Sequence, residues 1–139
     1  HTSNSGSEHL QDKVLFNKLK VYEHLAKILK PIIEENKGKS GLSSIGIVAG
    51  ATWPEDAKTL RVELPFSPFL IPGFGAQGAS AKKATSGLRR ESSGWEGGVV
   101  NSTRGLIFPE TAANAVHFGD WQLAIYDAIS EHRALLAAA

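Results

Sequence analysis

Three glycines in one short stretch have the spacing of a phosphate-binding loop. Gly73, Gly75 and Gly78 fit the pattern G-x-G-x-x-G within the sequence FLIPGFGAQGAS. In a dinucleotide-binding turn, this spacing lets backbone N–H groups approach a pyrophosphate at the N-terminus of a helix. The same stretch contains Gln77, whose side-chain amide can donate a hydrogen bond to an anion. We therefore expect a phosphate of some kind to bind at this loop.

A second candidate for phosphate binding is Arg104. It follows an apolar segment directly, and Gly105 after it allows a ligand to approach the backbone closely. A guanidinium group matches the geometry of a phosphate with two parallel hydrogen bonds. The alternative interpretation is an arginine that pairs with a neighbouring carboxylate at the rim of a sheet.

The context of the glycine loop argues against a dinucleotide. A dinucleotide-binding fold places an acidic residue at the end of the next strand, about 20 residues further on, to hold the ribose. Here the next apolar segment ends in Asn101 and Ser102, and Glu91 and Glu96 precede it. Pro72 also stands where the first strand would enter the tight turn. A loop for the phosphate of a mononucleotide is therefore the favoured interpretation.

Three short apolar segments are the expected strands that position these groups. They are bounded by turn residues and cover Ser44–Thr52, Pro68–Pro72 and Gly97–Ser102. Continuous apolar runs of this length are typical of strands buried on both faces. Helical patterns alternate with them, which predicts an α/β fold with a parallel sheet and helices outside it. Sites in such folds gather at the carboxyl ends of the strands.

The expected helices come from apolar periodicity and from start signals. A long helix is predicted from a capping box of Ser5 and Glu8 to Ile33, with a kink or an interruption at Pro31. A second capping box, of Thr52 and Glu55, opens the next helix. The remaining predictions are helices over Pro54–Leu64, about Ser80–Gly87 and Asp120–Leu136, and a loop over residues 89–96.

Composition limits the classes of function. The 139 residues suffice for one domain with its own core, and the apolar fraction of 42% is that of a globular protein. The net charge of +1 favours neither a nucleic acid nor a membrane surface, and no apolar run approaches the roughly 20 residues of a membrane span. The absence of cysteine suits the cytoplasm. The five histidines, predicted to lie at the surface or at termini, have no metal-ligand spacing: His1, His9, His24, His117 and His132.

Four motifs together resemble one enzyme family. The stretches HTSNSGS, GIVAGAT, FLIPGFGAQG and GGVVNSTRGLIF, in this order, are similar to the bacterial-type orotidine 5′-monophosphate decarboxylases. The resemblance spans nearly the whole chain. It implies that residues 1–139 are the second half of a (βα)8 TIM barrel, from the end of its fifth strand to its last helix. A start at His1 and the absence of methionine suggest a processed piece, a cloned segment or one half of a split protein.

The resemblance also implies roles for particular residues. Gln77 and Arg104, with backbone N–H groups near Gly75 and Gly105, would bind the 5′-phosphate of the substrate. The segment that meets the pyrimidine and ribose would contain Thr2, Ser3 and Asn4, with Pro72 against the ring. Ser5 stands where the family usually has a proline, which loosens this turn.

The catalytic residues of the family are not found in this sequence. Its Asp-x-Lys-x-x-Asp motif, in which the lysine protonates the pyrimidine carbon as carbon dioxide leaves, occurs nowhere between His1 and Ala139. The family needs no cofactor and no metal. The resemblance therefore implies that this chain binds orotidine 5′-monophosphate or uridine 5′-monophosphate and acts only with the N-terminal half of the enzyme, as a homodimer when complete. The alternative is a half barrel that binds a phosphorylated ligand without chemistry, and a dinucleotide oxidoreductase is a distant third.

Overall fold

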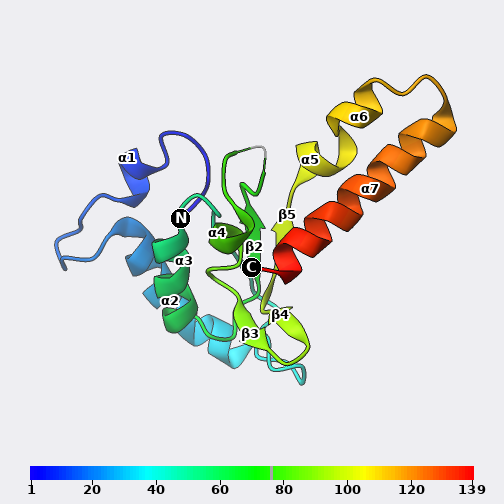
Figure 1. The fold of residues 1–139 in the computed structure, drawn as a ribbon. Coiled ribbons are helices and arrows are strands. Elements are labelled where there is room, and N and C mark those ends of the chain that lie inside the picture. The colour runs from blue at the N-terminus through cyan, green and yellow to red at the C-terminus, as the bar shows by residue number, and fades with distance from the viewer. Residues whose placement is uncertain (76) are drawn as a thin grey trace.

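A parallel sheet of three strands lies at the centre of the molecule (Figure 1). The computed structural model describes residues 1–75 and 77–139. The strands are β1 (Ile47–Val48), β2 (Phe69–Pro72) and β5 (Gly98–Asn101), and β2 lies between the other two. All three begin inside the predicted apolar segments, and both pairings are parallel, as predicted. The strands are shorter than the segments, since β1 pairs through only two residues.

Among the described residues there are seven helices, some packed on the sheet and others extending away from it. They are α1 (Glu8–Gln11), α2 (Val21–Glu35), α3 (Pro54–Glu63), α4 (Ala81–Ala84), α5 (Thr103–Ile107), α6 (Glu110–Ala113) and α7 (Phe118–Ala137). Figure 1 shows α2 and α3 packed together on one side, while α7 lies beside α5 and α6 and has its C-terminal end nearer the sheet. No described helix is both long and apolar enough to cross a membrane.

The predicted long first helix is wrong. It is divided into α1 and α2 by a stretch in which Val14 bridges to Lys20 and Lys18 has a left-handed φ of 63°. The Asn17 side chain accepts a hydrogen bond from the Leu19 N–H, so a local turn competes with the helix. The helix restarts where the N–H of Lys20 donates to the Glu23 carboxylate.

Two other predictions about the helices, an interruption at Pro31 and a capping box before α3, also differ from the structure. Pro31 lies inside α2 without ending it, on an exposed face of the helix. The predicted capping box of Thr52 and Glu55 does not form, because Trp53 is the N-cap of α3 and makes no side-chain cap bond. Pro54 nevertheless occupies the first helical position, where its fixed φ fits.

The predicted loop over residues 89–96 is a β-hairpin. Strands β3 (Arg89–Glu91) and β4 (Gly94–Glu96) pair antiparallel around Ser92 and Ser93. The sequence pattern did not predict this hairpin. Its strands are short, consist largely of charged residues on either side of the two serines, and show little alternation of apolar and polar residues. The short helices α5 and α6 were also not predicted.

The sheet is buried on one face only, which corrects the prediction of strands buried on both. Phe69 and Ile71 point into the core and are each 1% exposed. Their neighbour Leu70 is 46% exposed and pairs with Val48 on one side and Val99 on the other, which are 42% and 68% exposed. Paired residues of neighbouring strands share a face of the sheet. A row of three aliphatic side chains therefore faces outward.

Candidate functional site

The loop after β2 is a closed turn built by its glycines. Gly73, Gly75 and Gly78 have φ values of 106°, 72° and 86°, a region that residues with a side chain rarely adopt. The N–H of Gly75 donates to the Ala79 carbonyl, and the N–H of Gly78 donates to the Gly75 carbonyl. These two N–H groups are therefore used within the loop. An anion at this loop would depend on other donors.

The predicted phosphate-binding side chains line one hollow at the carboxyl ends of β2 and β5. Gln77 and Arg104 are both exposed and border a space of about 220 Å³. The other residues that line it are Pro72, Gly73, Phe74, Asn101, Ser102 and Thr103. Arg104 is the charged residue among them. The hollow thus joins a fixed positive charge, two neutral amides and two hydroxyl groups.

Ser3 lies beside this hollow, and Gly73 explains how close it comes. A Cβ atom on Gly73 would lie 3.1 Å from Oε1 of Gln77 and 3.2 Å from Cβ of Ser3. The chain around Ser3 is held against the end of β1, because the N–H of Gly50 donates to the His1 carbonyl at 2.7 Å. The segment that precedes α1 therefore reaches the same edge of the sheet as Gln77.

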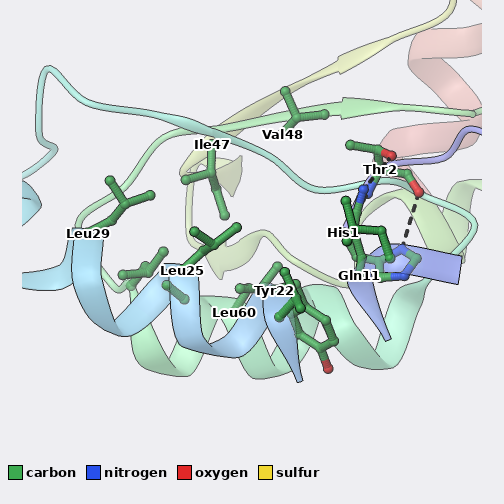
Figure 2. Close-up of a pocket in the computed structure, with 13 residues that line it drawn as sticks. His1, Thr2, Gln11, Tyr22, Leu25, Leu29, Ile47, Val48 and Leu60 are labelled. Carbon is green, nitrogen blue, oxygen red and sulfur yellow. Dashed lines mark hydrogen bonds between the residues drawn. The ribbon is translucent and has the colours of Figure 1, made fainter. Parts of the chain in front are cut away.

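Thr2 lies elsewhere. The N–H of Thr2 donates to Oε1 of Gln11 at 2.9 Å, and Nε2 of Gln11 donates to Oγ1 of Thr2 at 3.1 Å. Thr2 lines a different hollow, shown in Figure 2, and Asn4 is exposed. Of the four residues predicted to meet the pyrimidine and ribose, Pro72 lines the hollow of Gln77 and Ser3 lies beside it, whereas Thr2 lines the other hollow.

The second hollow is apolar and lies between α2 and β1. It has a volume of about 300 Å³, and Figure 2 shows Leu25 and Leu29 of α2 pointing toward Ile47 of β1. Val48 is at its rim. β1 has β2 on one side and no strand on the other among the described residues, so the hollow follows the free edge of the sheet.

His1, predicted to lie at the surface or at a terminus, is the first residue of this sequence and is nevertheless buried among aromatic rings and acids. Its ring centroid lies 4.4 Å from that of Trp53 and 5.6 Å from that of Tyr22. Atoms of His1, Asp12 and Asp56 that could serve as metal ligands lie within 4.8 Å of one another. The spacing of these residues in the sequence did not reveal this grouping.

Protein donors already bind both acids of this cluster. Nζ of Lys20 lies 2.9 Å from Asp12, and the hydroxyl of Tyr22 donates to Asp56 at 3.0 Å. Burial, followed by the Asp56 hydrogen bond, raises the pKa of Tyr22 well above its ordinary value. The hydrogen bond to Asp12 raises the pKa of Lys20. We interpret the cluster as a structural network that anchors α1 and α2.

Two residues near the predicted site were missed by sequence reasoning. Ser102 is buried, and its hydroxyl donates to the Phe74 carbonyl at 3.3 Å, which links the loop after β2 to the end of β5. His132 of α7 is half-buried with its ring 5.2 Å from that of Phe74. Ser102 lies within the motif GGVVNSTRGLIF but was given no role, and no motif marks His132, which comes from the last helix.

Comparisons with known proteins point to one family. No protein-family model matches the chain. The orotidine 5′-phosphate decarboxylase of Clostridium botulinum strain Hall is 44% identical over 106 residues, which are 76% of this chain and 35% of that protein. The orotidine 5′-phosphate decarboxylase of Rhodopirellula baltica is 35% identical over 127 residues, which are 89% of this chain and 41% of that protein.

The solved structures give the same relationship. The OMP decarboxylase of Leishmania donovani is 30% identical, with a TM-score of 0.59 over 96% of this chain and 45% of that chain. The fold is therefore part of a (βα)8 barrel, as predicted from the parallel sheet and the resemblance. The chain spans less than half the length of these curated relatives. Sequence and fold agree, and the family to which this chain belongs is that of the orotidine 5′-phosphate decarboxylases.

Proposed function

We propose that this chain supplies the phosphate- and pyrimidine-binding part of an orotidine 5′-monophosphate decarboxylase. The observation that supports the proposal most is the hollow bordered by both Gln77 and Arg104. The two residues follow neighbouring parallel strands, so one anion above the strand ends is within reach of both. Arg104 contributes a charge and a two-pronged donor, and Gln77 contributes a neutral donor.

Binding of the phosphate would assist a reaction that takes place elsewhere on the substrate. Energy from a remote group accelerates a reaction when the contact strengthens in the transition state. Pro72, which lines the hollow, and Ser3, which lies beside Gly73, would contact the nucleoside. The proton donor and the carboxylates for decarboxylation would come from the Asp-x-Lys-x-x-Asp motif of a first half.

We further propose that residues 1–139 form the second half of the barrel. A complete barrel has about 250 residues, and the curated relatives are more than twice as long as the part that this chain matches. The free edge of β1 and the apolar hollow beside it suit an added strand of the first half (Figure 2). The outward row of Val48, Leu70 and Val99 would then become the barrel interior.

The test uses the completed barrel, by which we mean this chain together with a first half from a close relative. Charge-assisted hydrogen bonds contribute about 1.5–3 kcal/mol each and neutral ones about 0.5–1.5 kcal/mol. Arg104→Ala should therefore weaken binding of uridine 5′-monophosphate by roughly 10- to 100-fold, and Gln77→Ala should weaken it less. Binding of uridine, which has no phosphate, should stay unchanged in both variants.

Calorimetric titration with uridine 5′-monophosphate, uridine and NAD measures these differences. Arg133→Ala is the matched control, because Arg133 is an exposed arginine of α7 outside the hollow. Equal losses for nucleoside and nucleotide, or tight binding of NAD, would refute the phosphate site. Nucleotide binding without turnover of orotidine 5′-monophosphate would support the non-catalytic alternative.

A further inference from the structure

A side chain at position 105 would collide with a histidine from the last helix. A Cβ atom on Gly105 would lie 2.7 Å from Nε2 of His132 and 2.8 Å from Oγ of Ser102. Contacts under 3.0 Å are essentially never seen for real Cβ atoms. The backbone φ of Gly105 lies outside the left-handed region, so the close approach of these two side chains accounts for the glycine.

The same histidine contacts the loop on the other side of the hollow. Its ring meets the Phe74 ring edge-on, with centroids 5.2 Å apart and planes at 79°. A Cβ atom on Gly75 would lie 3.9 Å from Nε2 of His132. Phe74 is only 6% exposed, so this contact is part of the packed interior of the site. His132 thus lies against both segments that carry the proposed phosphate-binding residues.

The orientation of the ring is fixed from its own helix. Nδ1 of His132 lies 2.8 Å from the Ala128 carbonyl oxygen. A carbonyl only accepts hydrogen bonds, so Nδ1 carries the hydrogen, and Nε2 is the atom turned toward Gly105. α7 packs on α4, which follows the loop of Gln77 in the chain, and on α5, which contains Arg104. The position of α7 can therefore affect the positions of both segments, because the His132 ring contacts each of them.

We infer that His132 is a positioning residue of the phosphate site, which holds the loop of Gln77 and the turn of Arg104 at a fixed separation. The inference rests on the proposed function, because it assigns His132 a role in the same site. It needs no direct contact between His132 and the phosphate. Gln77 and Arg104 must converge on one anion, so a loose separation of their two segments would weaken phosphate binding selectively.

The first experiment titrates variants of the completed barrel with uridine 5′-monophosphate and with uridine. His132→Ala should weaken nucleotide binding by about tenfold and leave uridine binding unchanged. His132→Phe retains a ring against Phe74 and should recover nucleotide affinity to within about threefold of the unmodified protein. His117→Ala, on an exposed histidine before α7, is the matched control and should have no effect. Unchanged nucleotide binding in His132→Ala, equal losses of nucleotide and uridine, or no recovery in His132→Phe would overturn the inference.

The second experiment separates this inference from the proposed function. Arg104→Ala reports on the phosphate site itself, so unchanged nucleotide binding in that variant refutes the proposed function. The contact of His132 with Gly105 is then read from unfolding of the completed barrel in urea. Gly105→Ala should lower the unfolding midpoint, and it should lower it less in a His132→Ala background because part of the clash is removed. Additive effects of the two substitutions would show that His132 does not hold this turn.

Discussion

At the scale of single residues, Arg61 is the charged side chain that links several backbone segments through hydrogen bonds. Its guanidinium donates to the carbonyls of Ser67, Gly87 and Gly97, each at 2.7 Å. It also lies over the Phe69 ring, with Cζ 3.7 Å from the centroid. Burial, with a smaller contribution from Arg89, lowers the pKa of Arg61 to about 10. This side chain connects α3, the start of β2 and the approach to β5.

Replacing Arg61 should therefore destabilise the fold strongly. Arg61→Leu removes a charged donor from three buried carbonyls, of which that of Gly97 keeps the Phe69 N–H as a partner, and hydrogen bonds from a charged group are worth about 1.5–3 kcal/mol each. Because such losses are not additive, we expect a decrease of about 3 kcal/mol or more in the free energy of unfolding. Urea unfolding of the completed barrel measures it. Arg133→Leu, at an exposed arginine of α7, should shift the midpoint little, and an equal shift in both variants would contradict the role given to Arg61.

At the scale of elements, the β3–β4 hairpin holds the end of α7. The indole N–H of Trp95 donates to the Leu136 carbonyl at 2.9 Å, and Arg90 donates to the Ala137 carbonyl at 3.4 Å. The last carbonyls of a helix have no partner within the helix, so these bonds satisfy two of them. The hairpin, which the sequence pattern did not predict, thus binds the C-terminal end of α7.

Loss of this contact should loosen the last turn of α7 alone. Trp95→Phe keeps a ring in place and removes the N–H donor, which should cost about 0.5–1.5 kcal/mol. Amide hydrogen exchange of residues 134–139 in the completed barrel should accelerate by roughly three- to tenfold. Trp121→Phe is the control, because that ring stacks on Phe118 at the other end of the helix. Unchanged exchange at the last turn in Trp95→Phe would disprove the contact.

At the scale of the whole molecule, one face of the sheet is covered by helices and the other is open. The open face presents the aliphatic row of Val48, Leu70 and Val99, and β1 presents a free edge among the described residues. Exposed apolar rows and unpaired edges favour association with other chains. Closure by a first half would cover both at once.

Leu70→Gln should therefore separate association from folding. Burying a leucine side chain contributes about 1.5–3 kcal/mol, so the variant should bind the first half roughly 10- to 100-fold more weakly. The same change should reduce light scattering by the chain alone, because the open face becomes less apolar. Val62→Gln, at an 82% exposed valine on α3, should change neither quantity. Equal binding of the first half by both variants would argue against closure over this face.

The sequence by itself determined the order of the main elements and pointed to the residues of the proposed phosphate site. The apolar runs that contain β2 and β5, the proline at the start of α3 and the glycines of the loop act over a few neighbouring residues, so a local pattern identifies them. Four ordered motifs likewise identified the family, and three of them span the ends of β1, β2 and β5.

Only the tertiary structure decided which distant residues meet. His132 reaches Phe74 and Gly105 because α7 folds back onto the ends of β2 and β5, and nothing in the residues around His132 records that packing. The burial of His1 and the one-sided burial of the sheet have the same origin. In each case the contact joins segments far apart in the chain, and its presence depends on how helices and strands pack in three dimensions.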